Sequence, residues 1–489
     1  MHVSFFPENT SRLFIEGELR DSSGGTYPVL DPSTGEVIGH AADATEEETS
    51  AAVAAARRAF DDTEWSRDHA LRARCLRQLR EAIDARLEEI REFTIAEVGA
   101  EHFLTTGPQL EGPVAGLDYW ADLLEGFEWR TDLGTADVMG LRSRREMRRE
   151  AAGVVAAITP WNFPHQINFA KIGPALAAGC TVVLKPAPDT PWCAAMLGEL
   201  AGATDLPPGV LNVVTSSRNE VGAQLTREPG VDLVSFTGST ATGKAIMRTA
   251  ADSLKRVFLE LGGKSASIVL DDADLGSACM MTAVNASMHA GQGCALTTRL
   301  LVPRERLDEA IELTKSALAG LAPGDPRDPG TMCGPIISAR QLDRIAGYIE
   351  LARAEGGTIE CGGAAPADKT GGFWFTPTLI SGLDPSSRVA QEEIFGPVLV
   401  ILAHDGDQHA IDIANNSPYG LSGAVWGSDP ARIEHVIDSV RTGTLGVNGA
   451  QWYGVDVPFG GFKQSGIGRE MGVEGFTEYL ETKAVGTPG

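Results

Sequence analysis

Five short apolar segments alternate with helix-forming stretches between residues 153 and 261, and this alternation constrains the fold more than any other feature. The five segments are 153–158, 181–184, 210–214, 231–236 and 257–261. Such alternation is typical of a parallel sheet covered by helices. Loops at the carboxyl ends of the strands of an open α/β sheet line one ligand crevice. We therefore expect the loops that begin at Thr159, Lys185, Thr215 and Thr237 to face a common binding site.

The flanking segments extend this α/β pattern. Residues 13–43 read as short strands and turns. Apolar residues three and four positions apart predict helices at 48–60, 68–98 and 108–126, and Thr45 with Glu48 has the spacing of a capping box. A second α/β region begins near residue 263. It is expected to contain strands at 265–270 and 299–302 and a helix at 304–320, and to continue through 391–397, 419–426 and 444–447.

Two segments stand apart from this pattern. Residues 141–150 are rich in Arg and Glu and are flanked by strand-like residues, so a solvated hairpin is the plainer interpretation and an interface element the alternative. The strand-like residues 483–485 near the end of the sequence could pair with an exposed strand edge.

Composition narrows the possible partners. The chain has 489 residues and a formal net charge of −25, which argues against nucleic acid or an anionic membrane surface. The start, Met1 to Pro7, lacks the basic and apolar regions of a secretory leader, and no apolar run is long enough to span a bilayer. The seven cysteines are scattered without a close pair, as expected for reduced thiols and not for a metal site. We expect a cytoplasmic protein.

Cys294 is a candidate nucleophile because it follows Gly291-Gln292-Gly293. Two nearby glycines let the backbone approach a substrate closely. On its own, however, a single cysteine is more often a small buried hydrophobic residue.

The segment Gly238 to Lys244 follows an expected strand and opens an expected helix, so its backbone amides could hold a phosphate. It nearly matches a P-loop, but Ala245 stands where that motif needs Ser or Thr for magnesium. Dinucleotide binding is therefore favoured over a packing turn without ligand, and both over an NTPase.

Two polar residues at expected strand ends could serve catalysis. Glu260 ends an apolar strand, where a carboxylate must be solvated, paired or functional, so a general base and a strand-end ion pair are equally good interpretations. Asn162 could donate to a developing oxyanion, although loop capping is the commoner use of such a residue.

Three further residues could contact a nucleotide. Lys185 ends another strand of the same sheet, with a solvated lysine as the alternative. Glu393 and Phe395 combine an acid with an aromatic ring that could touch a ribose and a base, although a structural Phe is the default.

Five motifs, taken together and in this order, resemble the aldehyde dehydrogenase superfamily. They lie at 159–164, 259–264, 291–294, 392–397 and 458–466, and the resemblance extends from about residue 13 to the end of the sequence. It implies a Rossmann-like parallel-sheet cofactor domain, an α/β catalytic domain and a small β oligomerisation element. The corresponding ranges are 1–128 with 152–262, then 263–470, and finally 129–151 with 471–489.

The resemblance also implies a role for each candidate residue. Cys294 would attack an aldehyde, Asn162 and the Cys294 amide would hold the oxyanion, and Glu260 would activate the water that hydrolyses the thioester. The presence of Glu260 favours hydrolysis over transfer to coenzyme A. The residues implied at the cofactor cleft are Thr159, Pro160, Trp161, Lys185, Gly238, Ser239, Gly243, Leu261, Gly262, Glu393 and Phe395.

The choice of cofactor rests on one departure from the family pattern. Most relatives have Glu where this chain has Pro188; here the acid is displaced to Asp189, and Arg218 nearby could favour a 2′-phosphate. NAD is the expected cofactor, with NADP as the alternative.

The resemblance leaves the aldehyde open. The implied pocket residues are Gln166, Ile167, Ala170, Ala295, Trp452, Tyr453 and Asp456, which mix apolar and polar side chains. A homo-dimer or homo-tetramer is expected. A catalytically silent relative on the same fold is the competing hypothesis, but it predicts loss of the cysteine or the base, and both are present.

Overall fold

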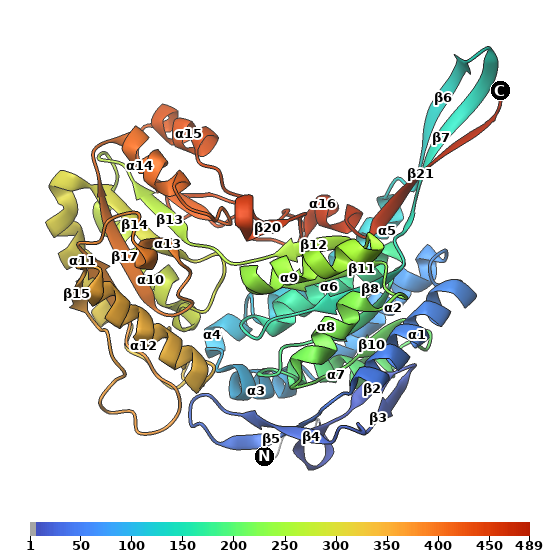
Figure 1. Ribbon diagram of the computed structural model, residues 1–489, viewed down its shortest axis with the longest axis horizontal. Coiled ribbons are helices and arrows are strands. Elements are labelled where there is room, and N and C mark those ends of the chain that lie inside the picture. The colour runs from blue at the N-terminus through green and yellow to red at the C-terminus, as the bar shows by residue number, and fades with distance from the viewer. Residues whose placement is uncertain (1–5) are drawn as a thin grey trace.

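The computed structural model describes residues 6–489 and contains two large sheets with helices packed around them (Figure 1). Residues 1–5, which the sequence analysis assigns to the cofactor domain, lie outside the described residues. The first large sheet has eight strands in the order β20-β12-β11-β8-β9-β10-β2-β3, and the second has seven in the order β15-β16-β17-β14-β13-β18-β19. The predicted α/β fold is confirmed.

The five predicted strands form the parallel centre of the first sheet. They are β8 (Val154–Ile158), β9 (Thr181–Lys185), β10 (Leu211–Val213), β11 (Leu233–Thr237) and β12 (Arg256–Glu260). The strand β8 lies in the middle, with β9 on one side and β11 on the other, so the winding direction reverses beside β8. A ligand crevice is expected at this reversal, outside the carboxyl ends of the strands.

Short strands complete the edges of this sheet. At one edge lie β2 (Leu13–Ile15) and β3 (Glu18–Arg20), and at the other lies β20 (Gly466–Ile467). Residues 466–467, expected with the catalytic domain, thus pair with β12 of the first sheet. A separate small sheet near the amino terminus contains β1 (Thr10–Ser11), β4 (Thr26–Leu30) and β5 (Val37–Ala42).

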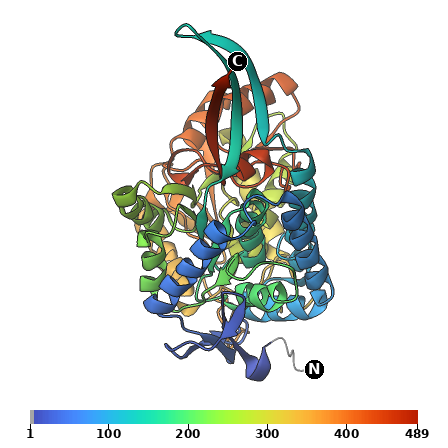
Figure 2. The ribbon, with the colours of Figure 1, turned by 90° about the vertical axis from the view of Figure 1, so that its right-hand side faces the viewer.

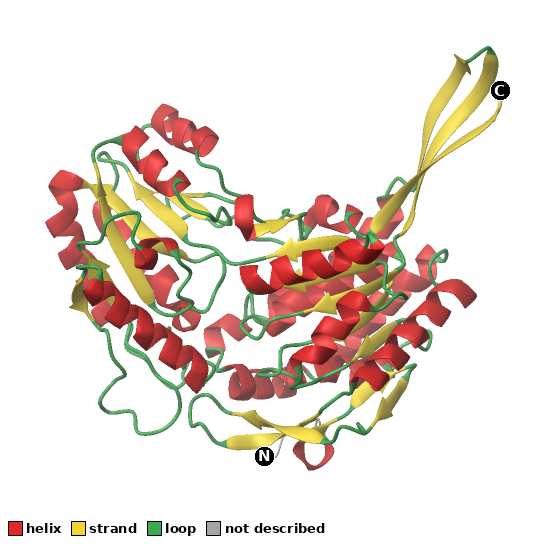
Figure 3. Cartoon of the chain, viewed as in Figure 1, coloured by secondary structure: helices red, strands yellow, loops and turns green. Residues whose placement is uncertain are grey.

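Helices cover both faces of the first sheet, as Figure 3 shows. They are α1 (Glu46–Asp62), α2 (His69–Asp84), α3 (Leu87–Val98), α4 (His102–Thr105), α5 (Glu111–Gly126), α6 (Pro164–Ala178), α7 (Trp192–Ala201), α8 (Asn219–Arg227) and α9 (Thr240–Ala250). The predicted capping box is confirmed: the Thr45 hydroxyl accepts from the Glu48 amide (3.3 Å), and the Glu48 carboxylate accepts from the Thr45 amide (2.9 Å).

The prediction of one helix over 68–98 is wrong. The chain leaves the helical region at Arg86 (φ −129°), and α2 and α3 are separate helices. Ile83 and Ile90 are both fully buried on either side of this break. Apolar periodicity therefore continues across it, which is why the sequence pattern does not reveal the change of direction.

The second sheet confirms the strands predicted near 265–270 and 299–302. Its strands are β13 (Ser265–Val269), β14 (Thr297–Pro303), β15 (Thr358–Cys361), β16 (Thr378–Ser381), β17 (Val398–His404), β18 (Gly423–Trp426) and β19 (Gly446–Val447). Its helices are α10 (Leu275–Ser287), α11 (Leu307–Ala319), α12 (Ala339–Ala354), α13 (Arg388–Gln391), α14 (Asp407–Asn415) and α15 (Pro430–Ser439). Residues 392–397 form a loop, since β17 begins only at Val398.

A three-stranded antiparallel sheet stands away from the body of the molecule (Figure 2). It consists of β6 (Arg130–Val138), β7 (Leu141–Ala151) and β21 (Leu480–Pro488), and α16 (Gly472–Thr477) precedes β21. Residues 141–150, expected as a hairpin, form the single strand β7, which makes a hairpin with β6. The predicted pairing of the 483–485 segment is confirmed, because Lys483 lies opposite Arg148. No helix among residues 6–489 is long and apolar enough to cross a bilayer.

The two large sheets meet at a short connection. Only Leu261 to Lys264 separates the end of β12 from the start of β13, so Glu260 lies where one sheet passes into the other. Cys294 precedes β14 of the second sheet, and Asn162 follows β8 of the first. The candidate site is therefore assembled at the junction of the two sheets.

Candidate active site

Cys294 lies on a tightly packed loop between α10 and β14 and is half-buried. A Cβ atom at Gly291 (φ +70°) would lie 2.2 Å from the Gly396 carbonyl oxygen, and one at Gly263 would lie 2.6 Å from the Cys294 carbonyl oxygen. Both distances are too short for a side chain, so glycine is required at each position. The loop thus approaches both the 392–397 loop and the connection between the sheets.

Glu260 is buried and forms a hydrogen bond with the Cys294 thiol. Burial raises the pKa of Glu260 well above its usual value, and the nearby Glu470 carboxylate raises it further. Burial also raises the pKa of Cys294, as does the negative charge of Glu260. At rest, the site therefore favours the protonated form of the Cys294 thiol. The carboxylate form of Glu260 lies beside it and can accept the thiol proton.

Asn162 lies opposite this pair and is buried. Its Nδ2 atom donates to the backbone carbonyl oxygen of Gln292 (2.9 Å). The backbone carbonyl oxygen of Asn162 accepts from Gln109 Nε2 (2.7 Å). The amide is therefore fixed in direction. Since Asn162, Glu260 and Cys294 line the same cavity, the structure brings the three predicted catalytic residues together.

A buried ion pair lies behind Glu260. Lys171 Nζ on α6 is 2.6 Å from Glu470 Oε1 and donates to Ser235 Oγ (3.2 Å), and both charged residues are almost fully buried. Sequence reasoning missed this pair. The available signal was a lysine within the apolar helical segment around Phe169 and Ile172, but nothing local in the sequence identifies its partner some 300 residues away.

The cavity in front of Cys294 has a volume of about 520 Å³. Glu260 and Glu470 are the charged residues of its wall, and no Lys or Arg among the described residues lines it. Most other lining side chains are apolar or aromatic, including Phe163, Ile167, Met281, Met288, Leu296, Trp426, Trp452 and Phe459. The cavity suits a neutral, largely apolar molecule.

Five of the seven expected pocket residues line this cavity, namely Gln166, Ile167, Ala295, Trp452 and Tyr453. Ala170 and Asp456 do not, so their placement in the pocket is corrected. Ala170 is buried in a cluster with Leu421, Phe459 and Met471, underneath the cavity wall. Asp456 Oδ1 lies against Gly454, 2.6 Å from the position of a Cβ there, and not at the wall.

Lys185 is the last residue of β9, and Glu393 lies in the loop between α13 and β17. Lys185 Nζ donates to the carbonyl oxygens of Pro186 (3.0 Å) and Ser216 (3.4 Å), and burial lowers its pKa to about 8. Glu393 Oε1 accepts from the Gly263 amide (3.0 Å), and burial raises its pKa to about 7. A Cβ at Gly262 would lie 2.3 Å from Glu393 Oε2, so this glycine leaves room for the carboxylate.

The helix α12 holds the loop that carries Glu393 and Phe395. Gln341 Nε2 donates to the Phe395 carbonyl (2.7 Å), and Arg344 Nη2 donates to the Glu393 carbonyl (2.6 Å). Phe395 has a left-handed backbone (φ +64°), and its ring packs edge-on against Trp161 with centroids 5.3 Å apart. Sequence reasoning missed Gln341 and Arg344, because surface-like polar residues on an amphipathic helix carry no motif.

The segment 238–244 opens α9 as predicted. Ser239 caps the helix by accepting from the Thr242 amide (3.2 Å), and a Cβ at Gly243 would lie 2.7 Å from Leu261 Cδ2. Lys244 Nζ is bound to Gln464 Oε1 (2.8 Å), so it does not point to the helix terminus as a P-loop lysine does.

The remaining cofactor candidates join this helix terminus to the sheet. The Gly238 amide donates to the Glu260 carbonyl (3.1 Å), and the Leu261 amide donates to that of Ser465 (2.8 Å). At the neighbouring strand, the Thr159 amide donates to the Lys185 carbonyl (3.0 Å), with Pro160 and Trp161 following in the same loop. Thr159, Gly238 and Leu261 thus directly follow three neighbouring strands, β8, β11 and β12, at their carboxyl ends.

Arg218 does not stand free as expected. Its Nε atom is 3.5 Å from Asp43 Oδ2, and its Nη2 atom donates to the Gly24 carbonyl (3.2 Å). Although burial opposes ionisation, hydrogen bonds from Ser216 and Ser217 lower the pKa of Asp43. A carboxylate therefore lies beside Arg218, and its charge also acts on Lys185.

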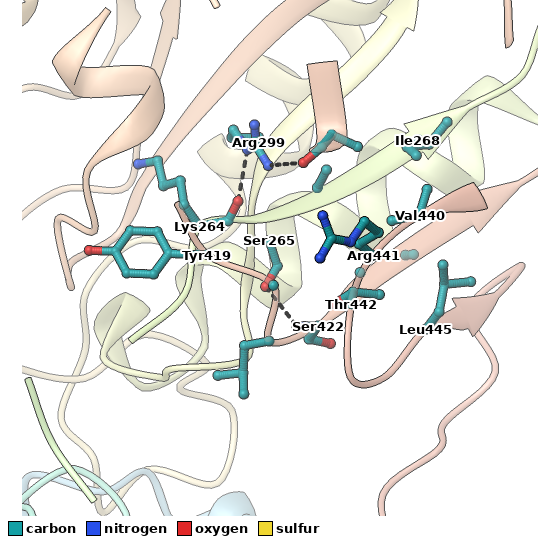
Figure 4. A pocket seen from close by; sticks show the side chains of 16 residues that line it. Lys264, Ser265, Ile268, Arg299, Tyr419, Ser422, Val440, Arg441, Thr442 and Leu445 are labelled. Atoms are coloured by element: carbon teal, nitrogen blue, oxygen red, sulfur yellow. Dashed lines mark hydrogen bonds between the residues drawn. The ribbon is translucent and has the colours of Figure 1, made fainter. Parts of the chain in front are cut away.

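Figure 4 shows a small pocket that Lys264, Ser265, Arg299 and Ser422 help to line. Arg299 Nε donates to the Lys264 carbonyl (2.7 Å), which fixes the start of β13. Lys264 Nζ is buried without a hydrogen-bond partner among the described residues, and burial lowers its pKa to about 7. Elsewhere, residues 6–489 contain no group of three or more His, Cys, Asp or Glu arranged to hold a metal.

Comparison with known proteins agrees with this geometry. Residues 19–485 match the model of the aldehyde dehydrogenase family. The chain is 41% identical to 3-succinoylsemialdehyde-pyridine dehydrogenase from a Pseudomonas species, over 97% of this chain and 98% of the relative. It is 39% identical to geranial dehydrogenase from Castellaniella defragrans, over 97% of this chain and 98% of that protein.

A solved structure supports the same assignment. The aldehyde dehydrogenase of Mycobacterium tuberculosis, complexed with NAD⁺, superposes with a TM-score of 0.92 at 39% identity, covering 97% of this chain and 98% of that one. The family model, the full-length relatives and this shared fold agree with the cysteine, carboxylate and amide gathered at the sheet junction. The chain therefore belongs to the aldehyde dehydrogenase family and is an NAD(P)-dependent enzyme of that kind.

Proposed function

We propose that this enzyme oxidises a neutral, largely apolar aldehyde to its carboxylic acid, with Cys294 as nucleophile, Glu260 as general base and Asn162 as oxyanion donor. The observation that carries these roles is the convergence of the three side chains on one cavity, with the Cys294 thiol hydrogen-bonded to Glu260. A nucleophile within hydrogen-bonding reach of its base is the arrangement that covalent catalysis requires.

In the first half-reaction Glu260 takes the thiol proton, and the Cys294 sulfur forms a bond to the aldehyde carbon. The carbonyl oxygen becomes an oxyanion, which accepts hydrogen bonds from Asn162 Nδ2 and from the Cys294 amide. Loss of one such donor typically costs roughly 10²- to 10³-fold in rate. The thiolate and not the thiol is the reactive form, so proton removal by Glu260 precedes attack.

NAD, which Lys185 and Glu393 would hold, would supply the acceptor for the hydride of the thiohemiacetal carbon, and loss of that hydride would leave a thioester on Cys294. Glu260 passes the thiol proton to solvent and becomes a carboxylate again. It then removes a proton from water, the hydroxide adds to the thioester carbon, and the carbon–sulfur bond breaks to release the acid and the Cys294 thiolate. General-base assistance of this kind contributes about 10²- to 10⁴-fold.

The crevice fits a dinucleotide at several points. The capped amino end of α9 can face a phosphate, and Lys185 and Glu393 lie where they can contact two riboses. Glycine at 262 leaves space for the Glu393 carboxylate, which a side chain would occupy. We assign NAD and not NADP, because the Asp43 carboxylate beside Arg218 disfavours a 2′-phosphate.

The substrate class follows from the cavity wall. Without a lysine or arginine in the wall, a substrate carboxylate would have no counter-charge, while Glu260 and Glu470 would repel it. Aromatic and methionine side chains favour an extended apolar chain. The names of the two relatives, which cite geranial and a pyridine semialdehyde, are compatible with aldehydes of this size.

We also propose a homo-dimer or homo-tetramer in the cytoplasm, built on the sheet of residues 129–151 and 471–489. The projecting strands β6, β7 and β21 carry the exposed apolar residues Leu133 and Leu141, which are costly to leave in water. Light scattering of the purified protein tests this assignment, and a monomer would overturn it.

The main experiment is a substrate screen with stopped-flow detection of NADH. Aliphatic aldehydes of increasing length, aromatic aldehydes and a semialdehyde carrying a carboxylate are compared for kcat/KM in the wild type and in Cys294→Ala. We expect neutral long-chain or aromatic aldehydes to be preferred and Cys294→Ala to form no NADH. A clear preference for the carboxylate-bearing aldehyde would overturn the substrate class, and NADH formation by Cys294→Ala would overturn the nucleophile.

A further inference from the structure

The loop before Cys294 contains three consecutive residues with left-handed backbone. They are His289 (φ +51°), Ala290 (φ +49°) and Gly291 (φ +70°). Two of the three are not glycine, and such residues cost of order 1–3 kcal/mol each unless the surroundings hold them in place. Some contact in this region must therefore fix the turn.

One anchor is the side chain of Gln292. Its Nε2 atom donates to the carbonyls of His289 (3.1 Å) and Pro335 (3.1 Å), and its Oε1 atom accepts from the Ile337 amide (2.9 Å). The carbonyl of the same residue accepts from Asn162 Nδ2 (2.9 Å). The orientation of the oxyanion donor thus depends on the turn that begins at His289.

The second anchor is the pairing of His289 with Glu101. The two side chains are 1% and 0% exposed, and His289 Nδ1 lies 3.6 Å from Glu101 Oε2. The imidazole also packs edge-on against Phe163, with ring centroids 5.1 Å apart. Neither imidazole nitrogen has a hydrogen-bond partner among the described residues, and neither does Glu101 Oε2. The contact between Nδ1 and Oε2 is therefore the closest polar pairing that these three buried atoms have.

Glu101 is itself fixed to the segment that holds Gln292. Its Oε1 atom accepts from the Gly334 amide (2.6 Å), next to the Pro335 carbonyl that binds Gln292. Cys333 is the other titratable group packed against this pair, and its pKa is raised by burial and by the charge of Glu101. Glu101 and Gln292 thus hold the same turn from two sides.

We propose that His289 and Glu101 form a positioning pair for the oxyanion site: the buried contact of the imidazole with the Glu101 carboxyl group holds the 289–291 turn, which directs the Gln292 carbonyl toward Asn162. A buried carboxylate without such a partner is costly, so losing His289 shifts Glu101 and the turn with it. His289 does not touch the substrate. It acts through Asn162, and the inference therefore rests on the role proposed for Asn162.

The test is a double-mutant cycle between the pair and Asn162. His289→Leu removes the donor, His289→Gln retains one, and Glu101→Gln keeps the shape of the carboxylate without its charge. Each is combined with Asn162→Ala, and kcat, KM and thermal stability are measured for every variant. His404→Leu is the matched control, because His404 is equally buried but lies at the far end of β17, where its Nε2 contacts the Val269 carbonyl (2.8 Å).

We expect His289→Leu and Glu101→Gln to lower kcat by about tenfold to a hundredfold, the range for small displacements of catalytic groups, with little change in the KM for NAD. His289→Gln keeps a hydrogen-bond donor near Glu101, so it should retain at least about a third of the wild-type kcat. In the Asn162→Ala background, His289→Leu should cause no further loss, because residues that act through one another are not additive.

Two kinds of result would overturn the inference. Additive losses in the double variant, or an equal loss of kcat in His404→Leu, would mean that His289 only stabilises the fold. A wild-type kcat in Asn162→Ala would overturn the proposed oxyanion role and the positioning pair together. In the first case Asn162→Ala is impaired and in the second it is not, so the two failures are distinguishable.

Discussion

The Cys294 thiol is hydrogen-bonded to the Glu260 carboxylate across the junction of the two sheets, and the two groups affect each other's ionisation in opposite directions. The negative charge of Glu260 raises the pKa of the thiol, whereas the hydrogen bond from Cys294 lowers the pKa of Glu260. The Glu260 carboxylate therefore disfavours the thiolate form of Cys294 until Glu260 itself accepts the thiol proton.

Replacing Glu260 with Gln should make the thiol more reactive while slowing turnover. The pKa of Cys294 falls when the nearby negative charge is removed, so inactivation by iodoacetamide at neutral pH should become a few times faster, as expected for a higher thiolate fraction. Steady-state oxidation should fall about 10²- to 10⁴-fold, because no base activates the hydrolytic water. Slower alkylation in Glu260→Gln would contradict this account.

Lys171 and Glu470 should shift the acid limb of the pH profile in opposite directions. Hydrolysis needs the Glu260 carboxylate, so its rate falls as pH drops through the pKa of that group. Lys171 lowers that pKa and Glu470 raises it. Lys171→Met should move the acid limb to higher pH and Glu470→Gln should move it to lower pH, each by roughly one pH unit. Thioester decay is followed by single-turnover quench at pH 5 to 9, and shifts of the same sign would contradict the prediction.

Lys171→Met should also destabilise the enzyme, because Glu470 is then left as a buried charge. The expected loss is about 3–5 kcal/mol, while Lys171→Met combined with Glu470→Leu should recover most of it. Denaturant unfolding measures both variants. A double variant no more stable than Lys171→Met would show that the ion pair is not the source of the loss.

The apparent affinity for NAD should be greatest between about pH 7 and pH 8. The pKa of Glu393 is raised to about 7, so this group is increasingly protonated below that pH and loses its accepting carboxylate. The pKa of Lys185 is lowered to about 8, so its positive charge is lost above that pH. The pH dependence of kcat/KM for NAD reports these free-enzyme groups. Glu393→Gln should flatten only the acid limb and Lys185→Met only the alkaline limb.

Asp43→Asn should improve the use of NADP. Removing this carboxylate frees Arg218 and abolishes repulsion of a 2′-phosphate, so the ratio of kcat/KM for NADP to that for NAD should rise about tenfold, or 1.4 kcal/mol. Asp189→Asn is the matched control, because sequence reasoning placed the relevant acid there. A larger change in Asp189→Asn than in Asp43→Asn would assign the discrimination to Asp189.

The sequence was sufficient to predict two kinds of feature: strands that recur as apolar segments along the chain, and site residues that belong to motifs in a fixed order. The strands β8 to β12 followed from apolar alternation, and their carboxyl ends meet at one crevice as the parallel topology requires. Glu260 and Asn162 were found because they lie at or just after the end of an apolar segment, and Cys294 because it follows Gly291-Gln292-Gly293. Local pattern and motif order thus located both the sheet and its site.

Long-range pairs could not be predicted in the same way. Lys171 pairs with Glu470, and His289 pairs with Glu101. The partners are far apart in the sequence, and no sequence periodicity links them. Ala170 was expected at the pocket and lies beneath it, because small rotations of α6 decide which residue faces the cavity. Such details depend on how packed elements are oriented, and a single sequence does not specify that orientation.

The eight-stranded sheet has a consequence for the order in which the protein is assembled. One edge is formed by β2 and β3 from residues 13–20, and the other by β20 from residues 466–467, which pairs with the strand that ends in Glu260. During synthesis from the amino terminus, the outer edge of β12 therefore remains unpaired until almost the whole chain has left the ribosome. Non-local closure of this kind slows folding and exposes intermediates to aggregation. Expression of residues 1–262 alone would leave the same edge permanently unpaired.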